Sequence, residues 1–437
     1  MTRKQKVGIV TLGCSKNTVD SERLIQQMLL NKINVVDDPE SADTVIINTC
    51  GFIEAAKEES INTILNAVQL KNEGKIKKVL VAGCLSERYR EELKKEIPEV
   101  DSFFGTENYK GILKALGVDL KKELLGERHL TTPKHYAYLK ISEGCNNPCS
   151  FCAIPLIRGK HKSRSIKSLV NEASFLASKG TKELILIAQD TTDYGIDIYG
   201  KRKLSELLNE LSRIDGIEWI RLLYAYPSHF PDDVIDTIAQ NPKVLKYIDI
   251  PLQHISDSVL KSMRRGITKR RTIELVNKLK ERIPGLVLRT TFIVGYPKET
   301  EHDFEELCSF VGDMKFDRIG TFTYSVEEST PSFVLNDPVS EKIKEERKSI
   351  LMEIQKDISL EKNKGFTGKK LKVIVDNLDG TGEDSFYVAR SYRDAPEVDG
   401  EVLIPAGHKL SIGKFYEASI YDYNEYDLFG KILKPAD

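Results

Sequence analysis

Apolar and polar stretches alternate regularly along the first 125 residues. Short runs rich in β-branched residues predict strands at 7–13, 33–38, 44–50, 78–84 and 102–106. Stretches with helical periodicity lie between them, such as residues 21–30 and 52–70. Apolar strands that alternate with helices are typical of a parallel α/β sheet buried on both faces. The pattern therefore predicts a first domain of this class over residues 1–125.

A second strand–helix series follows residues 117–135, which lose periodicity and predict a linker. Its strands are predicted at 136–142, 183–190, 219–226, 247–253, 286–295 and 318–326. Six βα units predict a complete or partial (βα)6 barrel over residues 131–338. The active face of such a barrel lies at the carboxyl ends of its strands.

The pattern of apolar and polar residues changes again near the end of the chain. Residues 339–364 predict a charged helix that connects two domains. Residues 365–437 contain short alternating strands separated by turn residues, which predict a small all-β barrel or sandwich. The whole chain is thus expected to be a multidomain α/β protein with a β domain at its end.

Charge and composition narrow the class of protein. The 437 residues include 65 Lys+Arg and 66 Asp+Glu, a net charge of −1, which argues against nucleic-acid binding over the whole surface but leaves room for a local basic patch. The opening residues are too short an apolar run for a signal peptide, and no run reaches the ~20 apolar residues of a membrane span. We therefore expect a cytoplasmic protein without a membrane partner.

One loop carries three cysteines in a Cys-x-x-x-Cys-x-x-Cys pattern. Cys145, Cys149 and Cys152 follow the first predicted strand of the barrel and so lie on its active face. Three thiolates in one loop can bind three irons of a [4Fe–4S] cluster and leave the fourth iron open. A zinc site with His161 as a weak fourth ligand, or three incidental thiols, is the alternative. Structural zinc usually has paired Cys-x-x-Cys units, so the pattern favours the cluster.

Three further cysteines each lie just past the end of a predicted strand of the first domain. Cys14, Cys50 and Cys84 are separated by 36 and 34 residues. Adjacent parallel strands end at the same edge of a sheet, where ligands bind. The three thiols are therefore predicted to converge and to hold a second cluster of the same type. The alternative is that they are small buried residues, a common role of free cysteine.

The two trios and the motifs around them resemble the radical S-adenosylmethionine (SAM) methylthiotransferase family. The motifs are LGCSKNTVDSE at 12–22 and GCNNPCSFCAIPLIRGKHKSR at 144–164, and the last domain resembles TRAM, a five-stranded barrel that engages substrate. The resemblance implies two [4Fe–4S] clusters: an auxiliary one on the first trio, and one on the second trio that binds and cleaves SAM. It further implies insertion of a methylthio group at an unactivated C–H bond.

The motifs also suggest a branch of the family. LGCSKNTVDSE and PLQHISD at 251–257 resemble the RimO-like branch, which modifies the β-carbon of an aspartate in ribosomal small-subunit protein twelve. Residues 366–437 hold 9 Lys+Arg and 13 Asp+Glu, a net charge of −4. An acidic domain attracts a basic ribosomal protein and repels phosphate, although solubility alone also explains such a surface. The alternative function is tRNA adenosine methylthiotransferase of the MiaB-like or MtaB-like branch, with tRNA as the less favoured partner.

Polar residues at the strand ends are candidates for contacts with SAM. They are Gln189, Gln253 and the backbone around Gly295. Arg158 could bind a carboxylate of SAM or of the substrate, or could be an ordinary surface or capping arginine. Lys16 and Asn17 are expected to orient the second cluster, and Cys308 to pack in the core. No catalytic residue is predicted beyond the six cluster ligands, and the electron donor is expected to be a protein such as flavodoxin or ferredoxin.

Overall fold

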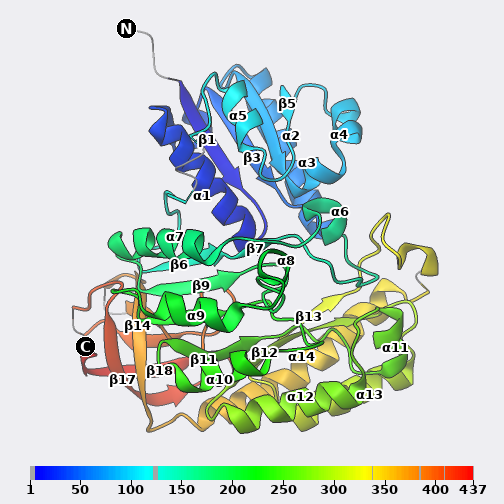
Figure 1. Ribbon diagram of the computed structural model, residues 1–437, viewed down its shortest axis with the longest axis vertical. Helices are drawn as coiled ribbons and strands as arrows, with labels where there is room; N and C mark the ends of the chain where they lie inside the picture. Colours follow the sequence, from blue (N-terminus) through cyan, green and yellow to red (C-terminus); the bar gives the residue numbers. More distant parts are fainter. Residues whose placement is uncertain (1–4, 122–125, 337, 383–384, 408, 437) are drawn as a thin grey trace.

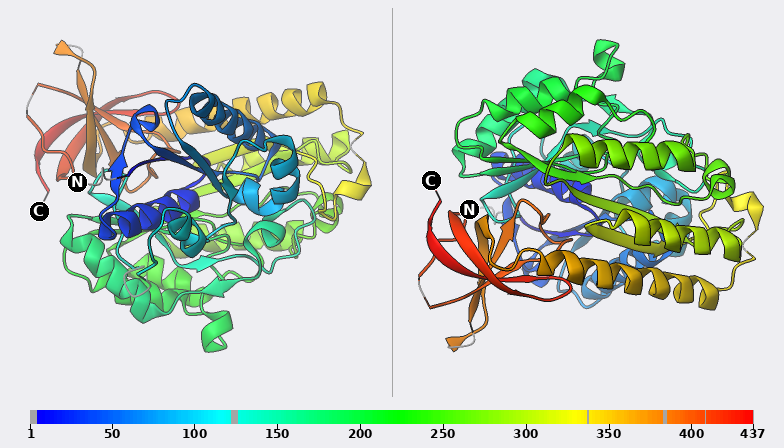
Figure 2. Two further views of the ribbon diagram at one scale, coloured as in Figure 1. Left: turned by 90° about the horizontal axis from the view of Figure 1, so that it is seen from above. Right: turned by 90° about the horizontal axis from the view of Figure 1, so that it is seen from below.

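The molecule consists of three domains, of which the N-terminal and central ones follow one another along its longest axis (Figure 1). The computed structural model describes residues 5–121, 126–336, 338–382, 385–407 and 409–436. The N-terminal domain lies above the six-stranded sheet of the central domain, and the C-terminal β domain lies beside the opposite end of that sheet (Figures 1 and 2). Within these ranges, no helix combines the length and the apolar character needed to cross a bilayer.

The N-terminal domain is a five-stranded parallel sheet with strand order β2-β1-β3-β4-β5. Its strands are β1 (Lys6–Thr11), β2 (Asn34–Val36), β3 (Thr44–Thr49), β4 (Lys78–Gly83) and β5 (Ser102–Phe103). Its helices are α1 (Ser15–Leu30), α2 (Glu54–Asn72), α3 (Cys84–Arg88), α4 (Arg90–Glu96) and α5 (Tyr109–Ala115), with a 3-10 helix at Pro39–Ser41.

Helices cover both faces of this sheet, which explains why its central strands are apolar throughout. Val45 and Ile47 of β3 pack with Ile64 of α2, whereas Ile46, between them, packs with Met28 of α1 on the other face. Successive side chains of a strand point to opposite faces, so both sets must be apolar.

The central domain is a parallel sheet with strand order β13-β12-β11-β10-β9-β6. Its strands are β6 (Tyr136–Lys140), β9 (Glu183–Ile187), β10 (Trp219–Leu222), β11 (Val244–Asp249), β12 (Val287–Val294) and β13 (Arg318–Thr323). In the part of the chain that the structure describes, β6 and β13 form the two edges, so the barrel is partial. The small antiparallel pair β7 (Ser142–Glu143) and β8 (Lys162–Ser163) flanks the cysteine loop.

Five helices pack their apolar sides on the outer face of the central sheet. They are α7 (Ile166–Ser178), α9 (Leu204–Ser212), α10 (Asp232–Gln240), α12 (Lys269–Arg282) and α13 (Glu301–Met314). The domain also contains the short helices α6 (Ile154–Arg158), α8 (Ile196–Tyr199) and α11 (Asp257–Ser262), and a 3-10 helix at Phe333–Leu335. Cys308 of α13 is half-buried against this core, as expected.

The two other domains close the inner face of the central sheet. Tyr138 and Tyr247 of the sheet belong to one apolar cluster with Val19 of α1 and with Ile374 and Phe415 of the β domain. The inner face is therefore shielded from solvent by domains that lie far apart in the sequence, and not by the barrel closing on itself.

The C-terminal domain is a closed five-stranded barrel, as the resemblance to TRAM implies. It is joined by α14 (Glu341–Lys364) and contains β14 (Lys370–Asp379), β15 (Phe386–Ser391), β16 (Val402–Pro405), β17 (Phe415–Tyr423) and β18 (Leu428–Pro435). Buried ion pairs hold it on the central domain, since Glu183 pairs with Arg221 at 2.7 Å and with Arg390 of β15 at 2.7 Å. The expected fold class is confirmed in all three domains.

Candidate functional site

The three N-terminal cysteines lie at one edge of the first sheet. Cys14, Cys50 and Cys84 follow β1, β3 and β4, which are neighbours. Thr49 pairs with Gly83 in the sheet, so Cys50 and Cys84 are the next residues along adjacent strands. A Cβ atom on Gly13 would lie 2.7 Å from Cys50 Cβ, which puts the loop of Cys14 against Cys50. The structure thus brings the predicted trio together, while its role as a ligand set stays a prediction.

Burial raises the pKa of two thiols of this trio, Cys50 and Cys84. Burial raises the pKa of the Cys84 thiol to about 11, against the opposing effect of Arg158, whose Nη2 donates to Cys84 Sγ at 3.4 Å. Burial also raises the pKa of Cys50, and the nearby Cys14 thiol adds to the shift. Thiols must lose their protons to bind metal. Metal binding at this trio would therefore displace the protons of Cys50 and Cys84.

The second trio occupies the loop between β7 and α6. The Cys145 N–H donates to the Gly159 carbonyl at 3.1 Å and so closes the loop. Both the backbone N–H and the side-chain amide of Asn147 donate to Cys145 Sγ at 3.4 Å, and Arg265 Nη1 donates to Cys149 Sγ at 3.2 Å. Donors directed at sulfur stabilise thiolates and thiolate-bound clusters, so this environment suits an iron–sulfur site.

Burial also affects two thiols of the second trio. Burial raises the pKa of Cys145 to about 11 and that of Cys152 to about 12. Tyr226, at the carboxyl end of β10, places its hydroxyl 3.6 Å from Cys149 Sγ and donates to the Arg265 carbonyl. The trio is therefore enclosed by residues from several elements of the central domain.

Arg158 joins the segment that carries the second trio to the first trio. It ends α6, and its side chain is 2% exposed. Besides Cys84 Sγ, its guanidinium donates to Asp20 Oδ2 at 2.8 Å, Glu143 Oε2 at 3.1 Å and Asn17 Oδ1 at 2.5 Å. These contacts place Arg158 beside the first trio. Its binding to a carboxylate of SAM or substrate stays a prediction.

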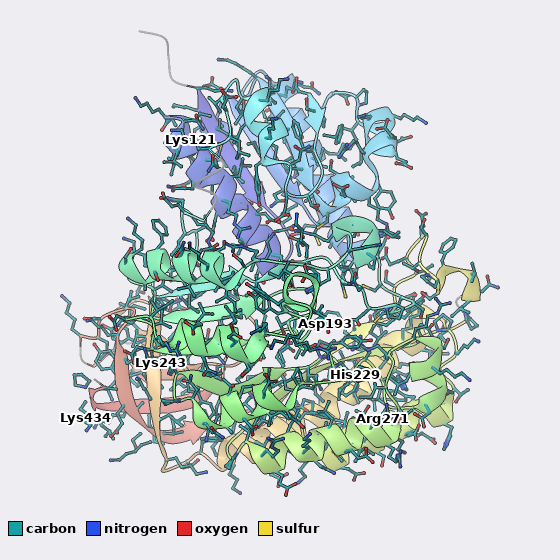
Figure 3. All side chains as sticks on the ribbon, viewed as in Figure 1. Lys121, Asp193, His229, Lys243, Arg271 and Lys434 are labelled. Carbon is teal, nitrogen blue, oxygen red and sulfur yellow. The ribbon has the colours of Figure 1, made fainter. Side chains whose placement is uncertain are left out.

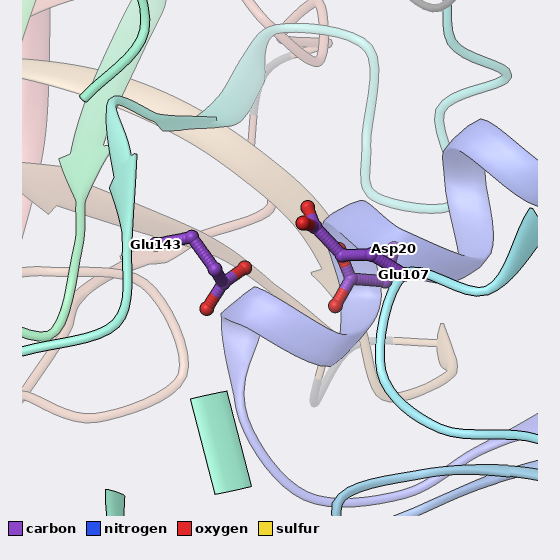
Figure 4. A group of neighbouring side chains, drawn as sticks. All are labelled: Asp20, Glu107 and Glu143. Carbon is purple, nitrogen blue, oxygen red and sulfur yellow. The ribbon is translucent and has the colours of Figure 1, made fainter. Parts of the chain in front are cut away.

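Three carboxylates meet at this domain boundary. Figure 4 shows Asp20 of α1, Glu107 and Glu143 of β7 turned toward one another. Lys140 Nζ pairs with all three, at 3.0 Å from Glu107 and 2.6 Å from Glu143. Although burial opposes it, Lys140 and Arg158 hold the pKa of both Asp20 and Glu143 below the usual range. The cations of this cluster are thus side chains, and its effect is to join the N-terminal and central domains.

The two predicted glutamines lie at strand ends of the central sheet. Gln189 Nε2 donates to Glu143 Oε1 at 2.8 Å, which connects it through Glu143 and Arg158 to the first trio. The Oε1 atoms of Gln189 and Gln253 are buried and have no hydrogen-bond partner among the described residues. Buried acceptors without partners are uncommon in native proteins and suit the N–H and O–H donors of a ligand.

Close packing against α14 requires glycine at position 295. Its φ is +73°, and a Cβ atom there would lie 2.3 Å from Lys344 Cγ of α14. Its N–H donates to Glu299 Oε2 at 2.8 Å. The space beside this glycine is therefore filled by the connecting helix, and its contact with SAM stays a prediction.

Several residues of the site were missed by sequence reasoning. They are Asp20, Glu107, Lys140, Glu143, Tyr226 and Arg265. Glu143 lies two residues before Cys145, and this closeness to the motif could have marked it. Arg265 and Tyr226 come from distant loops and carry no local pattern. Figure 3 shows how many side chains fill the boundary between the upper and central domains, where the label of Asp193 marks the loop after β9.

Family models match each domain in turn. Residues 6–105 match Uncharacterized protein family UPF0004, residues 139–311 match the Radical SAM superfamily, and residues 367–433 match the TRAM domain.

Relatives with curated names match nearly the full chain. The proteins of Cytophaga hutchinsonii, Flavobacterium psychrophilum and Bacteroides fragilis are 52%, 53% and 50% identical. The alignments cover 98–99% of this chain and 98–100% of those proteins. All three carry the name ribosomal protein uS12 methylthiotransferase RimO.

Solved structures share the fold. The radical SAM methyltransferase TsrM from Kitasatospora setae, with cobalamin and a [4Fe–4S] cluster bound, has a TM-score of 0.56 at 15% identity, covering 76% of this chain and 77% of that one. The cobalamin-dependent radical SAM enzyme OxsB has a TM-score of 0.51 at 12% identity, covering 80% and 56%. Identity at nearly full length and the succession of three domains show that the chain belongs to the radical SAM methylthiotransferase family, among relatives named RimO.

Proposed function

We propose that this protein inserts a methylthio group at the β-carbon of an aspartate in ribosomal protein uS12, using SAM and two [4Fe–4S] clusters. The observation that carries the proposal is identity of about 50% over nearly the whole chain to proteins named uS12 methylthiotransferase. The two cysteine trios add support, because Ala153 and Ile157, which follow the second trio, pack against Cys84 of the first.

The cysteines suit the clusters that this function needs. Cys145, Cys149 and Cys152 would hold the cluster that binds SAM, and Cys14, Cys50 and Cys84 the auxiliary one. When bound, such clusters supply the electron that cleaves SAM and a site for the sulfur that is transferred. Each trio provides three thiols and donors aimed at sulfur, which leaves one iron of each cluster without a cysteine from its trio.

The chain's own residues would hold the two sites in a fixed relation. Arg158 bonds to Cys84 and to Glu143, and Glu143 in turn accepts from Gln189. A buried arginine that donates to several acceptors at once is a rigid link. The unpaired Oε1 atoms of Gln189 and Gln253 would accept hydrogen bonds from SAM. Holding the two sites and SAM in fixed positions would favour reaction at a single carbon of the substrate and exclude water from it.

The proposed partners follow from charge and substrate. The net charge of −4 in residues 366–437 favours a basic ribosomal protein over tRNA. Flavodoxin or ferredoxin is the proposed electron donor, and the cytoplasm, where ribosomal proteins are found, is the proposed location.

Mass spectrometry on cells lacking the gene tests the proposal. We expect uS12 from these cells to lack the mass of one methylthio group on an aspartate, and a plasmid copy of the gene to restore it. Loss of the methylthio group from a tRNA adenosine, with uS12 unchanged, would show that the tRNA alternative is right.

A further inference from the structure

Lys16 is a buried lysine that forms no ion pair with a carboxylate of the described residues. It lies two residues after Cys14, on the first turn of α1, and is 8% exposed. Its ammonium group sits 3.1 Å above the centre of the Tyr224 ring. Within the described residues it forms no ion pair, whereas the similarly buried Lys140 is paired with three carboxylates. A desolvated cation without a counter-ion is costly, so the position calls for an explanation.

The carboxylates near the Tyr224 backbone are engaged by other donors. Asp249 accepts from the Tyr224 N–H at 3.1 Å and from Arg289 at 3.0 Å. Asp190 accepts from Asn147 and from Thr192. The face of the Tyr224 ring is thus a partial substitute for an anion, because its negative quadrupole attracts the ammonium group.

Tyr224 is itself held in an unusual backbone conformation. Its φ is +60°, a value that bulky residues rarely adopt. The backbone is fixed on both sides, since the N–H donates to Asp249 and the carbonyl accepts from the Thr191 N–H at 3.1 Å. Strain that surrounding contacts maintain is concentrated at functional sites. The strained turn and the buried cation meet face to face, across the boundary between two domains.

Each member of the pair is close in the sequence to a residue of one trio. Lys16 comes from the loop and helix that follow Cys14, and Tyr224 lies two residues before Tyr226, whose hydroxyl is 3.6 Å from Cys149 Sγ. The contact between Lys16 and Tyr224 thus joins a segment next to the N-terminal trio to a segment next to the second trio. The proposed reaction would need both trios near the substrate carbon, so a cation that joins these segments is a candidate to bind the substrate.

We propose that Lys16 binds the side-chain carboxylate of the substrate aspartate, with the Tyr224 ring holding the ammonium group in place until the substrate arrives. This inference rests on the proposed function, which makes the substrate side chain an anion. Lys16 is then a specificity residue, because a neutral side chain or a nucleobase offers no charge to a buried ammonium group.

The test compares uS12 with a form that has asparagine at the modified position, each assayed against wild-type and Lys16→Met enzyme after anaerobic loading with iron and sulfide. The asparagine form is used as a competitive inhibitor, so its binding is measured without turnover. We expect wild-type enzyme to bind the aspartate form at least tenfold more tightly, and Lys16→Met to bind the two forms equally. Lys16→Arg should retain part of the preference. Equal discrimination by wild-type and Lys16→Met enzyme would overturn the inference.

Three measurements separate this outcome from other causes. Iron content and SAM cleavage are measured for Lys16→Met beside the binding assay, and loss of either would overturn the inference in favour of a structural role next to Cys14. A rise in the KM for SAM would overturn it in favour of the SAM carboxylate. Lys179→Met is a matched control, because Lys179 is exposed and lies 5.3 Å above the Phe175 ring. If wild-type enzyme modifies tRNA and not uS12, the proposed function fails, and the inference fails with it.

Discussion

The two cysteine trios are built in opposite ways. Cys145, Cys149 and Cys152 share one loop, which Gly144 and Gly159 close locally. The N-terminal trio is collected from the ends of three strands, and its members are 36 and 34 residues apart in the chain. The first arrangement depends on a single turn of backbone, and the second on the fold of a whole domain. The two sites should therefore fail under different perturbations.

Removing one ligand from each trio should have the largest effect and should separate their roles. Cys149→Ala is expected to abolish both SAM cleavage and methylthio transfer. Cys50→Ala is expected to leave SAM cleavage intact and to abolish transfer, because the electron-transfer site is untouched. The measurements are 5′-deoxyadenosine formation and the mass of uS12 after anaerobic reconstitution. Methylthio transfer by Cys50→Ala would contradict the assignment of two separate sites, and Cys308→Ala serves as a control since Cys308 packs outside both trios.

The contrast also explains what the sequence could predict. The second trio could be predicted because it forms a local sequence motif. The first trio could be predicted because each of its cysteines follows an apolar strand, and the ends of adjacent parallel strands meet at one edge of the sheet. Such rules could not predict the hydrogen-bond partners of Arg158. Asp20 and Asn17 are 138 and 141 residues away from it, and no local periodicity encodes a contact across two domains.

The placement of the C-terminal barrel was unpredictable for the same reason. Its strands are recognisable from alternation and turns, but Arg390 and Glu183, which dock it, are 207 residues apart. Periodicity reports which face of an element is buried, and leaves open which domain covers that face. The shielding of the inner face of the central sheet by two other domains therefore emerged from the structure alone.

Adding a methyl group beside each trio should damage that trio alone. Gly83 has φ 96° and ψ −159°, a conformation nearly restricted to glycine, and a Cβ atom there would lie 2.4 Å from Asn48 Oδ1. Gly83→Ala should destabilise the N-terminal domain by on the order of 4 kcal/mol and lower transfer while SAM cleavage continues. Gly144→Ala, with a Cβ 2.2 Å from the Lys160 carbonyl, should instead lower SAM cleavage.

Thermal unfolding and the two activity assays measure these effects. Gly74→Ala is the matched control, since Gly74 also has a positive φ but has open space around its Cβ position. It should cost about 1 kcal/mol from backbone strain and change neither activity. Equal loss of both activities in Gly83→Ala and Gly144→Ala would show that the trios are not independent.

Breaking the link between the trios should uncouple them. Arg158→Met leaves the buried carboxylates of Asp20 and Glu143 with Lys140 as the remaining cation, at a cost of about 3 kcal/mol. We expect each trio to keep its iron while the ratio of SAM cleaved to uS12 modified rises. Arg158→Lys should uncouple less, because it keeps the charge without the fork of donors. A ratio that stays at the wild-type value in Arg158→Met would show that the link has no role in coupling.

Acid should weaken the contact between the N-terminal and central domains through Glu172 of α7. This is the smallest of the predicted effects. Although burial opposes it, Arg164, Arg23 and Arg128 lower the pKa of Glu172 from 4.5 to about 2, and Arg23 belongs to α1 of the N-terminal domain. A carboxyl group with a lowered pKa in the folded state stabilises the fold fully above its unfolded pKa, and this stability is lost as the pH falls toward the folded value. About 2 kcal/mol should therefore disappear between pH 4.5 and 3. Chemical denaturation across this range should show a shallower acid loss in Glu172→Gln than in wild type, because the variant has no proton to take up, and an identical slope would show that Glu172 does not hold the domains together.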